Sequence, residues 1–395
     1  MLFMIAHSKY IPRILNPPHG SYFLLGPRGT GKSTWLRHQY PQATRIDLLL
    51  GEEERRFSAY PEKIRDVAAS LPRGSTLILD EIQRVPRLLP EIHALIEEKK
   101  EIQYIMTGSS SRKLRRTVSD LLGGRALLRQ MGPFLASELK EEFSLEKALT
   151  TGLIPLIWES SDPQQRLLDY LHLYLKEEVQ AEGLVRQIGD FSRFLEISSF
   201  SHASVWTTTD ISRESSVKRA TVDNYLQILE DLLLAFTIPV FTRRVKRKLI
   251  AHPKFYFFDA GVYRILRPQG ILDSSQEIEG WALEGLVAQH LRNWILAQNQ
   301  PHSLSFWRTQ TKLEVDFVIY GPRGFWAIEV KRSPNLGPDD VRALNAFKEE
   351  YPEAECFFVI PGKRHENYRG FPILPLEEFL LGINPDNLIF EKQLT

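Results

Sequence analysis

Short apolar runs alternate with helix-like spacing over the first third of the chain. Residues 21–25, 76–79 and 103–106 are brief and apolar, a pattern typical of strands that are buried on both faces. Residues 33–40 and 88–100 instead carry apolar side chains at helical spacing. This alternation predicts a parallel sheet covered by helices.

Longer helical segments follow from about residue 162. Residues 164–181 and 220–235 have helical periodicity, and residues 206–235 fit a helix, a short turn and a longer helix. An apolar strand is expected at 255–258. A helix–turn–helix followed by a strand with basic residues is typical of a winged helix.

The last part of the chain predicts a second α/β region. A helix is expected at 279–297, and strands at 314–319 and 324–331 are joined by a turn containing Gly321 and Pro322. A helix at 338–349 and a strand at 356–360 follow. We therefore expect an α/β protein with three domains: a P-loop ATPase domain at 1–155, a helical and winged-helix-like region at 156–268, and an α/β domain at 269–395.

Composition describes an ordinary globular protein. Hydrophobic residues make up 43% and charged residues 25%, and the net charge of +1 gives no overall indication of a nucleic-acid partner. The single cysteine, Cys356, excludes an internal disulfide and favours a reducing compartment. No apolar stretch approaches the roughly 18 residues that a membrane span needs. We expect a cytoplasmic protein with no membrane partner.

The strongest chemical signal is a glycine-rich loop between the first predicted strand and helix. Residues 26–33 match the pattern G-x-x-x-x-G-K-[ST], in which backbone N–H groups surround nucleotide phosphates. We expect Lys32 to reach the β- and γ-phosphates of ATP and Ser33 to hold Mg²⁺. A plain glycine-rich turn is the alternative. The predicted nucleotide-binding residues are Gly26, Pro27, Arg28, Gly29, Thr30, Gly31, Lys32, Ser33 and Thr34.

Two adjacent carboxylates follow the strand predicted at 76–79. Ligand chemistry gathers at the carboxyl ends of parallel strands. We therefore expect Asp80 to bind Mg²⁺ in its outer shell and Glu81 to polarise the attacking water. A solvated acidic turn is the alternative.

The next strand supplies candidates that sense the γ-phosphate. It ends in Thr107-Gly108-Ser109-Ser110, where Thr107 and Ser109 are the candidates, although serines also simply make turns. Arg125 is a candidate arginine finger, acting in cis or in trans, with a surface arginine as the alternative. The predicted catalytic residues are thus Glu81, Arg125 and Ser109.

These segments resemble the predicted AAA+-superfamily ATPases of bacteria and archaea, over residues 15 to 360. Residues 79–83 and 107–110 are similar to that family's second and third ATPase motifs, and residues 124–138 to its domain-closing segment. The resemblance implies an ATPase joined to a C-terminal domain of unknown function. A clear counterpart of the second sensor arginine is missing, which bears on how ATP would drive movement.

Basic residues cluster at two places in the middle of the chain. Lys218 and Arg219 begin the second helix of the expected helix–turn–helix. Further on, the segment 243–248 holds five basic residues, which are Arg243, Arg244, Lys246, Arg247 and Lys248. In a winged helix such a wing contacts DNA phosphates. The alternatives are a protein contact or a solvated basic run.

A third constellation lies in the C-terminal part. Asp316 and Glu329 end adjoining strands, and Lys331 shares the face of Glu329 because strand side chains alternate. Such a set suits a Mg²⁺ site, with Glu284 available from the preceding helix. The order resembles the PD-(D/E)xK nuclease core, particularly that of archaeal Holliday-junction resolvases. A surface hairpin with ordinary charges is the alternative.

Three functions fit this sequence. The first is an ATPase that engages DNA, with branched or damaged DNA as the preferred form and a C-terminal domain that has the nuclease-like core but need not cleave. The second is a regulatory NTPase switch that binds a protein partner. The third is a metal-dependent nuclease that ATP licenses. The sequence leaves the oligomeric state open, with a homo-oligomer as one option.

Overall fold

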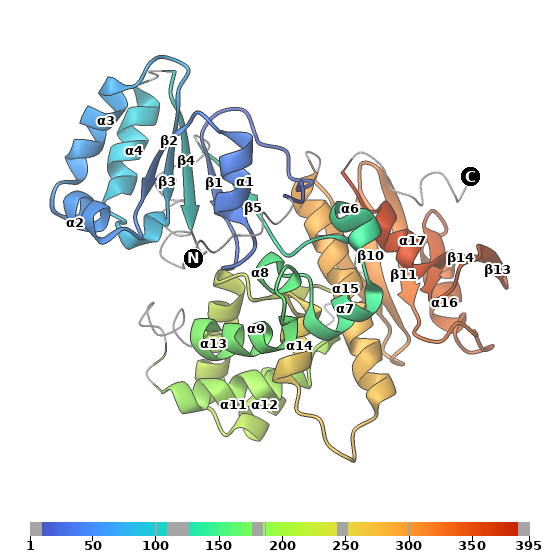
Figure 1. The fold of residues 1–395 in the computed structure, drawn as a ribbon. Helices are drawn as coiled ribbons and strands as arrows, with labels where there is room; N and C mark the ends of the chain where they lie inside the picture. Colours follow the sequence, from blue (N-terminus) through green and yellow to red (C-terminus); the bar gives the residue numbers. More distant parts are fainter. Residues whose placement is uncertain are drawn as a thin grey trace. The chain divides into compact units, whose positions relative to one another are not determined.

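The computed structural model describes residues 10–98, 101–108, 126–175, 185, 187–242, 252–298 and 301–385. The chain divides into two units by the contacts between its residues (Figure 1). The first unit consists of Leu15–Gly132 and Gln227–Leu234. The second consists of Met1–Ile14, Pro133–Leu226 and Ala235–Thr395. The segments on either side of residue 268 thus belong to one unit, and the chain passes from the first unit to the second between Gly132 and Pro133.

The first unit is built on a parallel sheet of five strands. The strands are β1 (Tyr22–Leu25), β2 (Thr44–Asp47), β3 (Thr76–Asp80), β4 (Gln103–Gly108) and β5 (Leu127–Gln130). Their order is β2-β3-β4-β1-β5, and every neighbouring pair is parallel. The three inner strands are those that the apolar runs predict. The two edge strands lack a continuous apolar run and were missed.

Helices cover both faces of this sheet. They are α1 (Lys32–Gln39), α2 (Gly51–Ala59), α3 (Ile64–Ser70) and α4 (Leu88–Glu97). Successive residues of a strand point to opposite faces. Accordingly Phe23 and Leu25 pack in a cluster with residues of α2, α3 and α4, whereas Tyr22 and Leu24 pack with Trp35 of α1. Figure 1 shows α1 on one side of the sheet and the other three helices on the opposite side.

The second unit begins with short helices and a small antiparallel sheet. The helices are α6 (Ala136–Leu139), α7 (Leu145–Thr151), α8 (Pro155–Trp158) and α9 (Pro163–Asp169), and a π-helical stretch (Tyr170–Leu175) follows. Next come α11 (Ile188–Ser199), β6 (Ser204–Val205), α12 (Thr208–Ser215), α13 (Arg219–Asp231), β7 (Ala235–Ile238) and β8 (Lys254–Phe257). Strand β8 lies between β6 and β7 and is antiparallel to both.

The helix predicted at 220–235 is shorter than expected. Helix α13 ends at Asp231, Leu233 has a φ of 56°, and the chain continues as β7. A left-handed residue cannot continue a right-handed helix, so the apolar run after Asp231 changes from helix to strand. The basic residues 243–248 lie outside the described residues.

The C-terminal part forms a mixed sheet of six strands with a long helix. The elements are α14 (Ala260–Leu266), α15 (Ser275–Ala297), β9 (Ser303–Arg308), β10 (Glu314–Gly321), β11 (Gly324–Val330), α16 (Arg342–Glu350), β12 (Glu355–Ile360), β13 (Glu366–Tyr368), β14 (Phe371–Pro375) and α17 (Leu376–Gly382). The strand order is β13-β14-β12-β11-β10-β9. Both predicted hairpin strands are present. Helix α16 begins four residues later than predicted, after a turn.

The mixed sheet has a core on each face. Residues of α15, such as Leu286 and Leu291, pack with Phe317 of β10 and Ile328 of β11. On the other face, Phe347 of α16 packs in a cluster with Val318 of β10, among others. Backbone hydrogen bonds attach the small sheet to this one, because Phe306 of β9 accepts from Phe241 N at 2.7 Å and donates to the carbonyl oxygen of Pro239 at 3.0 Å.

A buried histidine joins α15 to the start of α6. Nε2 of His290 accepts a hydrogen bond from Ala136 N at 2.9 Å, and Nδ1 lies 2.8 Å from the carbonyl oxygen of Leu286. With Nε2 accepting, Nδ1 carries the proton, so the ring is neutral. Burial lowers the pKa of His290 to about 4.

We expect acid to destabilise the second unit through His290. Its folded pKa lies below its unfolded value, so its contribution is complete above pH 6.5 and is lost as the pH falls through 4. A shift of this size corresponds to on the order of 3 kcal/mol. Urea unfolding at pH 7 and pH 4.5 should show a smaller pH dependence for His290→Gln than for wild type. His252→Gln, which changes an exposed histidine, serves as the control. An equal change in the free energy of unfolding between the two pH values for all three proteins would contradict this role of His290.

Candidate functional site

The glycine-rich loop connects β1 to α1 and has the backbone of a phosphate-binding loop. Gly29 and Gly31 have φ values of 78° and 86°, which favour glycine. A Cβ atom on Gly26 would lie 2.2 Å from the carbonyl oxygen of Met131, so a side chain does not fit there. The Thr30 hydroxyl donates to the carbonyl oxygen of Pro27 at 2.8 Å and closes the loop.

The loop lysine lies folded over the loop itself. Nζ of Lys32 donates to the carbonyl oxygens of Gly26 at 2.6 Å and Pro27 at 3.2 Å, and the residue is 6% exposed. These oxygens hold the ammonium beside the loop whose backbone would receive phosphates. Two other predicted binding residues, Arg28 and Thr34, are exposed.

Asp80 connects the loop to the end of β4. Its Oδ2 accepts a hydrogen bond from the Ser33 hydroxyl at 2.7 Å, and its Oδ1 accepts one from the Thr107 hydroxyl. Strand β4 lies between β1 and β3, so the carboxyl ends of all three strands meet at one edge of the sheet. The structure therefore brings together Ser33, Asp80 and Thr107, as the spacing of the three motifs predicts.

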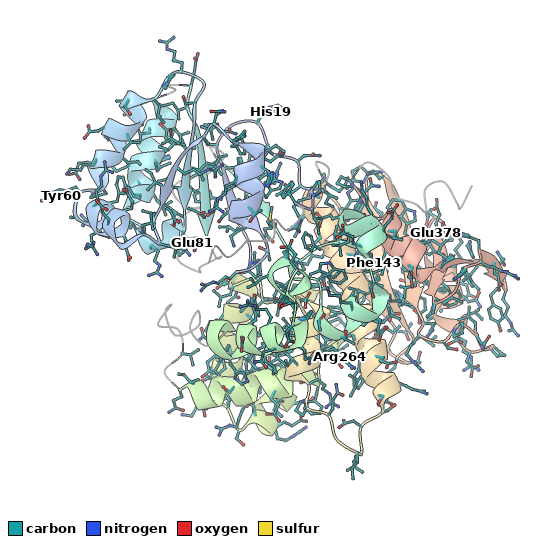
Figure 2. All side chains as sticks on the ribbon, viewed as in Figure 1. His19, Tyr60, Glu81, Phe143, Arg264 and Glu378 are labelled. Carbon is teal, nitrogen blue, oxygen red and sulfur yellow. The ribbon has the colours of Figure 1, made fainter. Side chains whose placement is uncertain are left out.

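Glu81 follows Asp80 in a left-handed conformation, with a φ of 58°. This conformation is uncommon for a residue with a Cβ atom and turns the chain away from the strand. Its backbone N–H donates to the Thr107 hydroxyl at 3.3 Å, and its carboxylate accepts from the Gln83 side chain. Figure 2 labels Glu81 at one end of the sheet. Ser109 and Arg125, the other two predicted catalytic residues, lie outside the described residues.

The C-terminal constellation also comes together. Lys331 Nζ lies 2.8 Å from Glu329 Oε1, and Asp316 accepts a hydrogen bond from Val330 N at 2.9 Å. Glu329 Oε2 in turn lies 3.4 Å from Asp316 N. Asp316 and Glu329 lie one residue beyond the antiparallel pair Phe317 and Ile328 of β10 and β11. The sequence predicts this proximity from the alternation of side chains along two paired strands.

Lys254, at the start of β8, was missed by the sequence analysis. Its ammonium lies 2.7 Å from Glu284 Oε1, 2.7 Å from Glu314 Oε1 and 3.4 Å from Asp316 Oδ1. The Tyr256 hydroxyl, two residues along the same strand, also donates to Glu284 Oε1 at 2.7 Å. We call Glu284, Glu314, Asp316 and Glu329 the C-terminal carboxylate cluster.

Burial and mutual repulsion govern the charges of this cluster. Burial raises the pKa of Glu329 to about 8, and Asp316 adds to the rise. Burial also raises the pKa of Glu284 to about 7, although Lys254 opposes it. Burial lowers the pKa of Lys254, but the surrounding carboxylates more than offset this and hold it well above its usual value. The lysine is therefore a fixed positive charge.

Family comparisons match the chain in three consecutive parts. A family model described as an AAA domain matches residues 19–140, which include the loop, Asp80 and Thr107. The match supports a P-loop ATPase fold for this segment. Models described only as domains of unknown function, DUF8612 and DUF4143, match residues 142–273 and 279–379.

Two mycobacterial proteins are similar to this chain along most of its length. An uncharacterized protein of Mycobacterium bovis and one of Mycobacterium tuberculosis are each 23% identical over 372 residues, which cover 93% of this chain and 80% of the relative. Among solved structures, PCH-2 of C. elegans is similar, with 14% identity over 54% of this chain and a TM-score of 0.23. The chain spans 61% of that protein.

The ATPase domain has oxygen donors suited to Mg²⁺. Mg²⁺ prefers carboxylate and hydroxyl oxygens and nucleotide phosphates. The Ser33 hydroxyl and the Asp80 carboxylate lie within hydrogen-bond distance of each other beside the loop. Asp80 accepts hydrogen bonds from two neutral hydroxyls, so a cation would find its negative charge available. When bound, Mg²⁺ neutralises phosphate charge.

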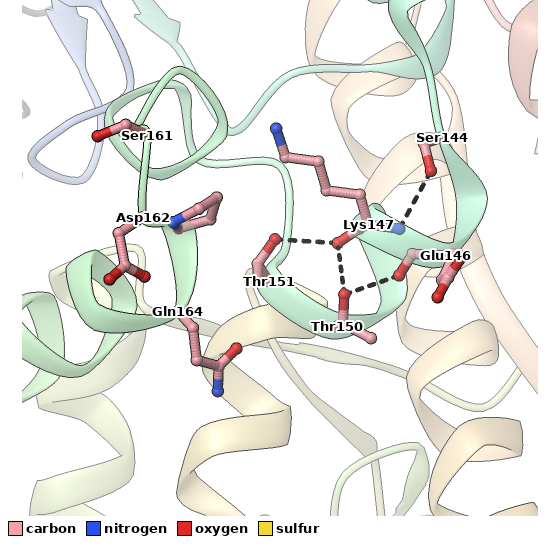
Figure 3. A pocket seen from close by; sticks show the side chains of 9 residues that line it. Ser144, Glu146, Lys147, Thr150, Thr151, Ser161, Asp162 and Gln164 are labelled. Carbon is pink, nitrogen blue, oxygen red and sulfur yellow. Dashed lines mark hydrogen bonds between the residues drawn. The ribbon is translucent and has the colours of Figure 1, made fainter.

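An open pocket of about 340 Å³ lies in the second unit. It is lined by residues of α7 and the start of α9, and Figure 3 shows their hydrogen bonds. The Thr150 and Thr151 hydroxyls donate to backbone oxygens of their own helix. Lys147 Nζ donates to the carbonyl oxygen of Trp158 at 2.7 Å. These polar groups serve helix structure and give the pocket no ligand-specific arrangement.

Over the described residues, no helix is long and apolar enough to cross a bilayer. Within the same part of the chain, no group of three His, Cys, Asp or Glu side chains is arranged to hold a metal ion.

We expect Thr107 to position the carboxylates of the ATPase domain. Thr107→Val removes a hydroxyl that donates to Asp80 and accepts from Glu81 N. Loss of such a supporting hydrogen bond should lower kcat for ATP by about 10- to 100-fold and raise the Mg²⁺ concentration needed for half-maximal activity. Thr107→Ser keeps the hydroxyl and should stay close to wild type. Equal Mg²⁺ titrations of Thr107→Val and wild type would refute this role.

Proposed function

We propose that this protein is an ATPase that engages DNA, with branched DNA such as a four-way junction as the preferred form. The ATPase half is supported by one observation, the hydrogen-bonded set of Ser33, Asp80 and Thr107 beside the phosphate loop of an AAA domain. Lys32 binds the β- and γ-phosphates, and Ser33 and Asp80 hold Mg²⁺. Glu81 accepts the proton of the attacking water, and Ser109 and Arg125 are further candidates for contact with the γ-phosphate.

The DNA half rests on the order of elements in the middle segment. Helix α11, strand β6, helices α12 and α13 and strands β7 and β8 follow one another as in a winged helix. Lys218 and Arg219, at the start of α13, are exposed. The five basic residues from Arg243 to Lys248 lie between β7 and β8, where a winged helix has its wing. Basic side chains at these two places in the order of elements, of which Lys218 and Arg219 are exposed, suit contact with DNA phosphates.

A second candidate is a regulatory ATPase switch that binds a protein partner through an inactive C-terminal domain. Lys254 favours it, because its ammonium lies within hydrogen-bond distance of carboxylates that a PD-(D/E)xK nuclease would use for a metal. ATP turnover separates the two candidates. It should be measured without DNA and with duplex, single-stranded and four-way-junction DNA. Stimulation by one DNA form supports the first candidate, and no stimulation by any form supports the second.

We expect Glu81→Gln and Lys32→Ala to fail at different steps. Glu81→Gln should bind ATP as wild type does but lower kcat by about 100-fold or more, because it removes the base that accepts the proton of water. Lys32→Ala should instead raise the Kd for ATP, because the phosphates lose a cation. Fluorescent-nucleotide titration and phosphate release measure the two effects. Wild-type turnover by Glu81→Gln would show that another residue activates the water.

We expect neutralisation of the wing to reduce the salt dependence of DNA binding. Changing Arg243, Arg244, Lys246, Arg247 and Lys248 to Gln removes up to five phosphate contacts. The magnitude of the slope of log K against log salt concentration should fall by up to about 4.5, since each contact releases about 0.9 counterion. A control variant with five exposed basic residues changed elsewhere (Lys140, Lys312, Lys363, Arg364 and Arg369) should keep the wild-type slope. An unchanged slope in the wing variant would favour the protein-partner candidate.

A further inference from the structure

We propose that the ammonium of Lys254 is the resident cation of the C-terminal carboxylate cluster and excludes a divalent metal ion from it. This inference does not depend on the proposed ATPase and DNA roles; it deepens the second candidate, an inactive C-terminal domain, which rests on the same contacts of Lys254. It predicts that wild-type protein binds no metal there and that removal of one side chain uncovers a latent metal site.

The contacts of Lys254 match the capacity of an ammonium group. A lysine ammonium has three donors. The structure gives it three carboxylate partners, Glu284 and Glu314 at 2.7 Å and Asp316 at 3.4 Å. The lysine side chain is 2% exposed. A buried lysine with this set of acceptors is fully paired, as a buried charge requires.

The position of the ammonium is the position that a metal ion would need. The sequence assigns Asp316 and Glu329 to metal binding, with Glu284 from α15 available to complete the site, and Lys254 contacts Asp316 and Glu284. Carboxylate oxygens hold Mg²⁺ at about 2.0–2.1 Å. A cation between these oxygens would therefore collide with Nζ. The two occupants exclude each other.

Tyr256, two residues after Lys254 in β8, also holds the carboxylate of Glu284. Tyr256 shares the face of β8 with Lys254, because side chains alternate along a strand. Its hydroxyl donates to the same oxygen of Glu284 at 2.7 Å. Glu284 Oε1 thus has two donors from β8, and the pairing turns the carboxylate toward β8.

The net charge of the cluster also suits a single internal cation. Lys331 faces Glu329 at 2.8 Å, and Arg308 faces Glu314 at 3.5 Å. Among the described residues, Lys254, Lys331 and Arg308 thus face the four carboxylates of the cluster. Replacing Lys254 with a neutral side chain removes the cation that Glu284, Glu314 and Asp316 share. A divalent cation in the freed space would restore an opposite charge beside these carboxyl groups and favour their ionised form.

The decisive experiment measures Mn²⁺ binding by electron paramagnetic resonance to the full-length protein without nucleotide. It compares four proteins: wild type, Lys254→Met, Asp316→Asn, and the double variant that carries both changes. Lys254→Met should bind one more Mn²⁺ per chain than wild type, and Asp316→Asn should abolish that extra site. Any Mn²⁺ at the P-loop is common to all four proteins and cancels. Lys147→Met, which changes a lysine that donates to a backbone carbonyl, is the matched control and should gain no site.

Thermal unfolding gives a second readout. Lys254→Met should melt below wild type without metal, because it leaves buried carboxylates without their cation. Mn²⁺ at 100 times its Kd should then raise the melting temperature of the variant by roughly 5–10 °C and leave that of wild type unchanged.

Two outcomes would overturn the proposal. One is wild-type protein that binds Mn²⁺ in a manner lost in Asp316→Asn, since Lys254 would then not exclude the metal. The other is a folded Lys254→Met that gains no site sensitive to Asp316→Asn. If Lys254→Met does not fold, the comparison of wild type with Asp316→Asn decides, and equal Mn²⁺ binding by these two supports the proposal. ATP turnover plays no part in either readout, so failure here is distinguishable from failure of the proposed function.

Discussion

A carboxylate removed from water must find a partner, and both units of this protein are organised around that constraint. In the first unit, Asp80 is held by the hydroxyls of Ser33 and Thr107. In the second, Glu138 accepts from Arg13 and from the backbone of Leu135 and Ile14, which ties the start of the chain to α6. The C-terminal carboxylate cluster is the largest example, and its partner is the ammonium of Lys254.

The carboxylates of the two candidate sites have different kinds of hydrogen-bond partner: neutral hydroxyls beside Asp80, and an ammonium in the C-terminal carboxylate cluster. The hydroxyls beside Asp80 are neutral, so they orient the carboxylate without cancelling its charge. A cation can still gain from that charge, which is what a nucleotide site with Mg²⁺ requires. Lys254 instead cancels charge where Glu284 and Asp316 meet. Two groups of carboxylates at strand ends thus have opposite readiness to take up a metal ion, although their sequences look equally suited to it.

The sequence predicts a site well when its residues are close together along the chain, and poorly when they come from distant segments. Residues 26–33 and the pair Asp80 and Glu81 are contiguous, so strand–loop–helix patterning places them correctly. The approach of Lys331 to Glu329 follows from alternation along one strand. Lys254 reaches Asp316 across 62 residues, and neither hydrophobic pattern nor spacing carries that information. The only available signal was a lysine at the head of an apolar strand, since lysine is almost never fully buried without a partner.

The fold shows the same division between local and distant causes. The inner strands of the parallel sheet can be predicted from their apolar runs. The edge strands β2 and β5 have no such run, and they form because they pair with neighbouring strands that are distant in the sequence. The apolar stretch after Asp231 has helical spacing, yet its last part pairs with β8, because tertiary pairing outweighs weak local preference. The hydrophobic pattern thus predicted correctly that these residues are buried, but it extended helix α13 into residues that form a turn and the start of β7.

The contacts of β7 and β8 bear on how the basic residues between them could act. Phe241 follows β7, and its backbone N–H donates to the carbonyl oxygen of Phe306 in the mixed sheet. The ring centroids of Phe241 and Phe325 lie 5.3 Å apart. Lys254, the first residue of β8, is held by the C-terminal carboxylate cluster. Both ends of the segment that carries residues 243–248 are therefore anchored on the C-terminal part of the chain. The ammonium that, in our proposal, keeps metal out of the carboxylate cluster thus lies at one end of the segment proposed to bind DNA.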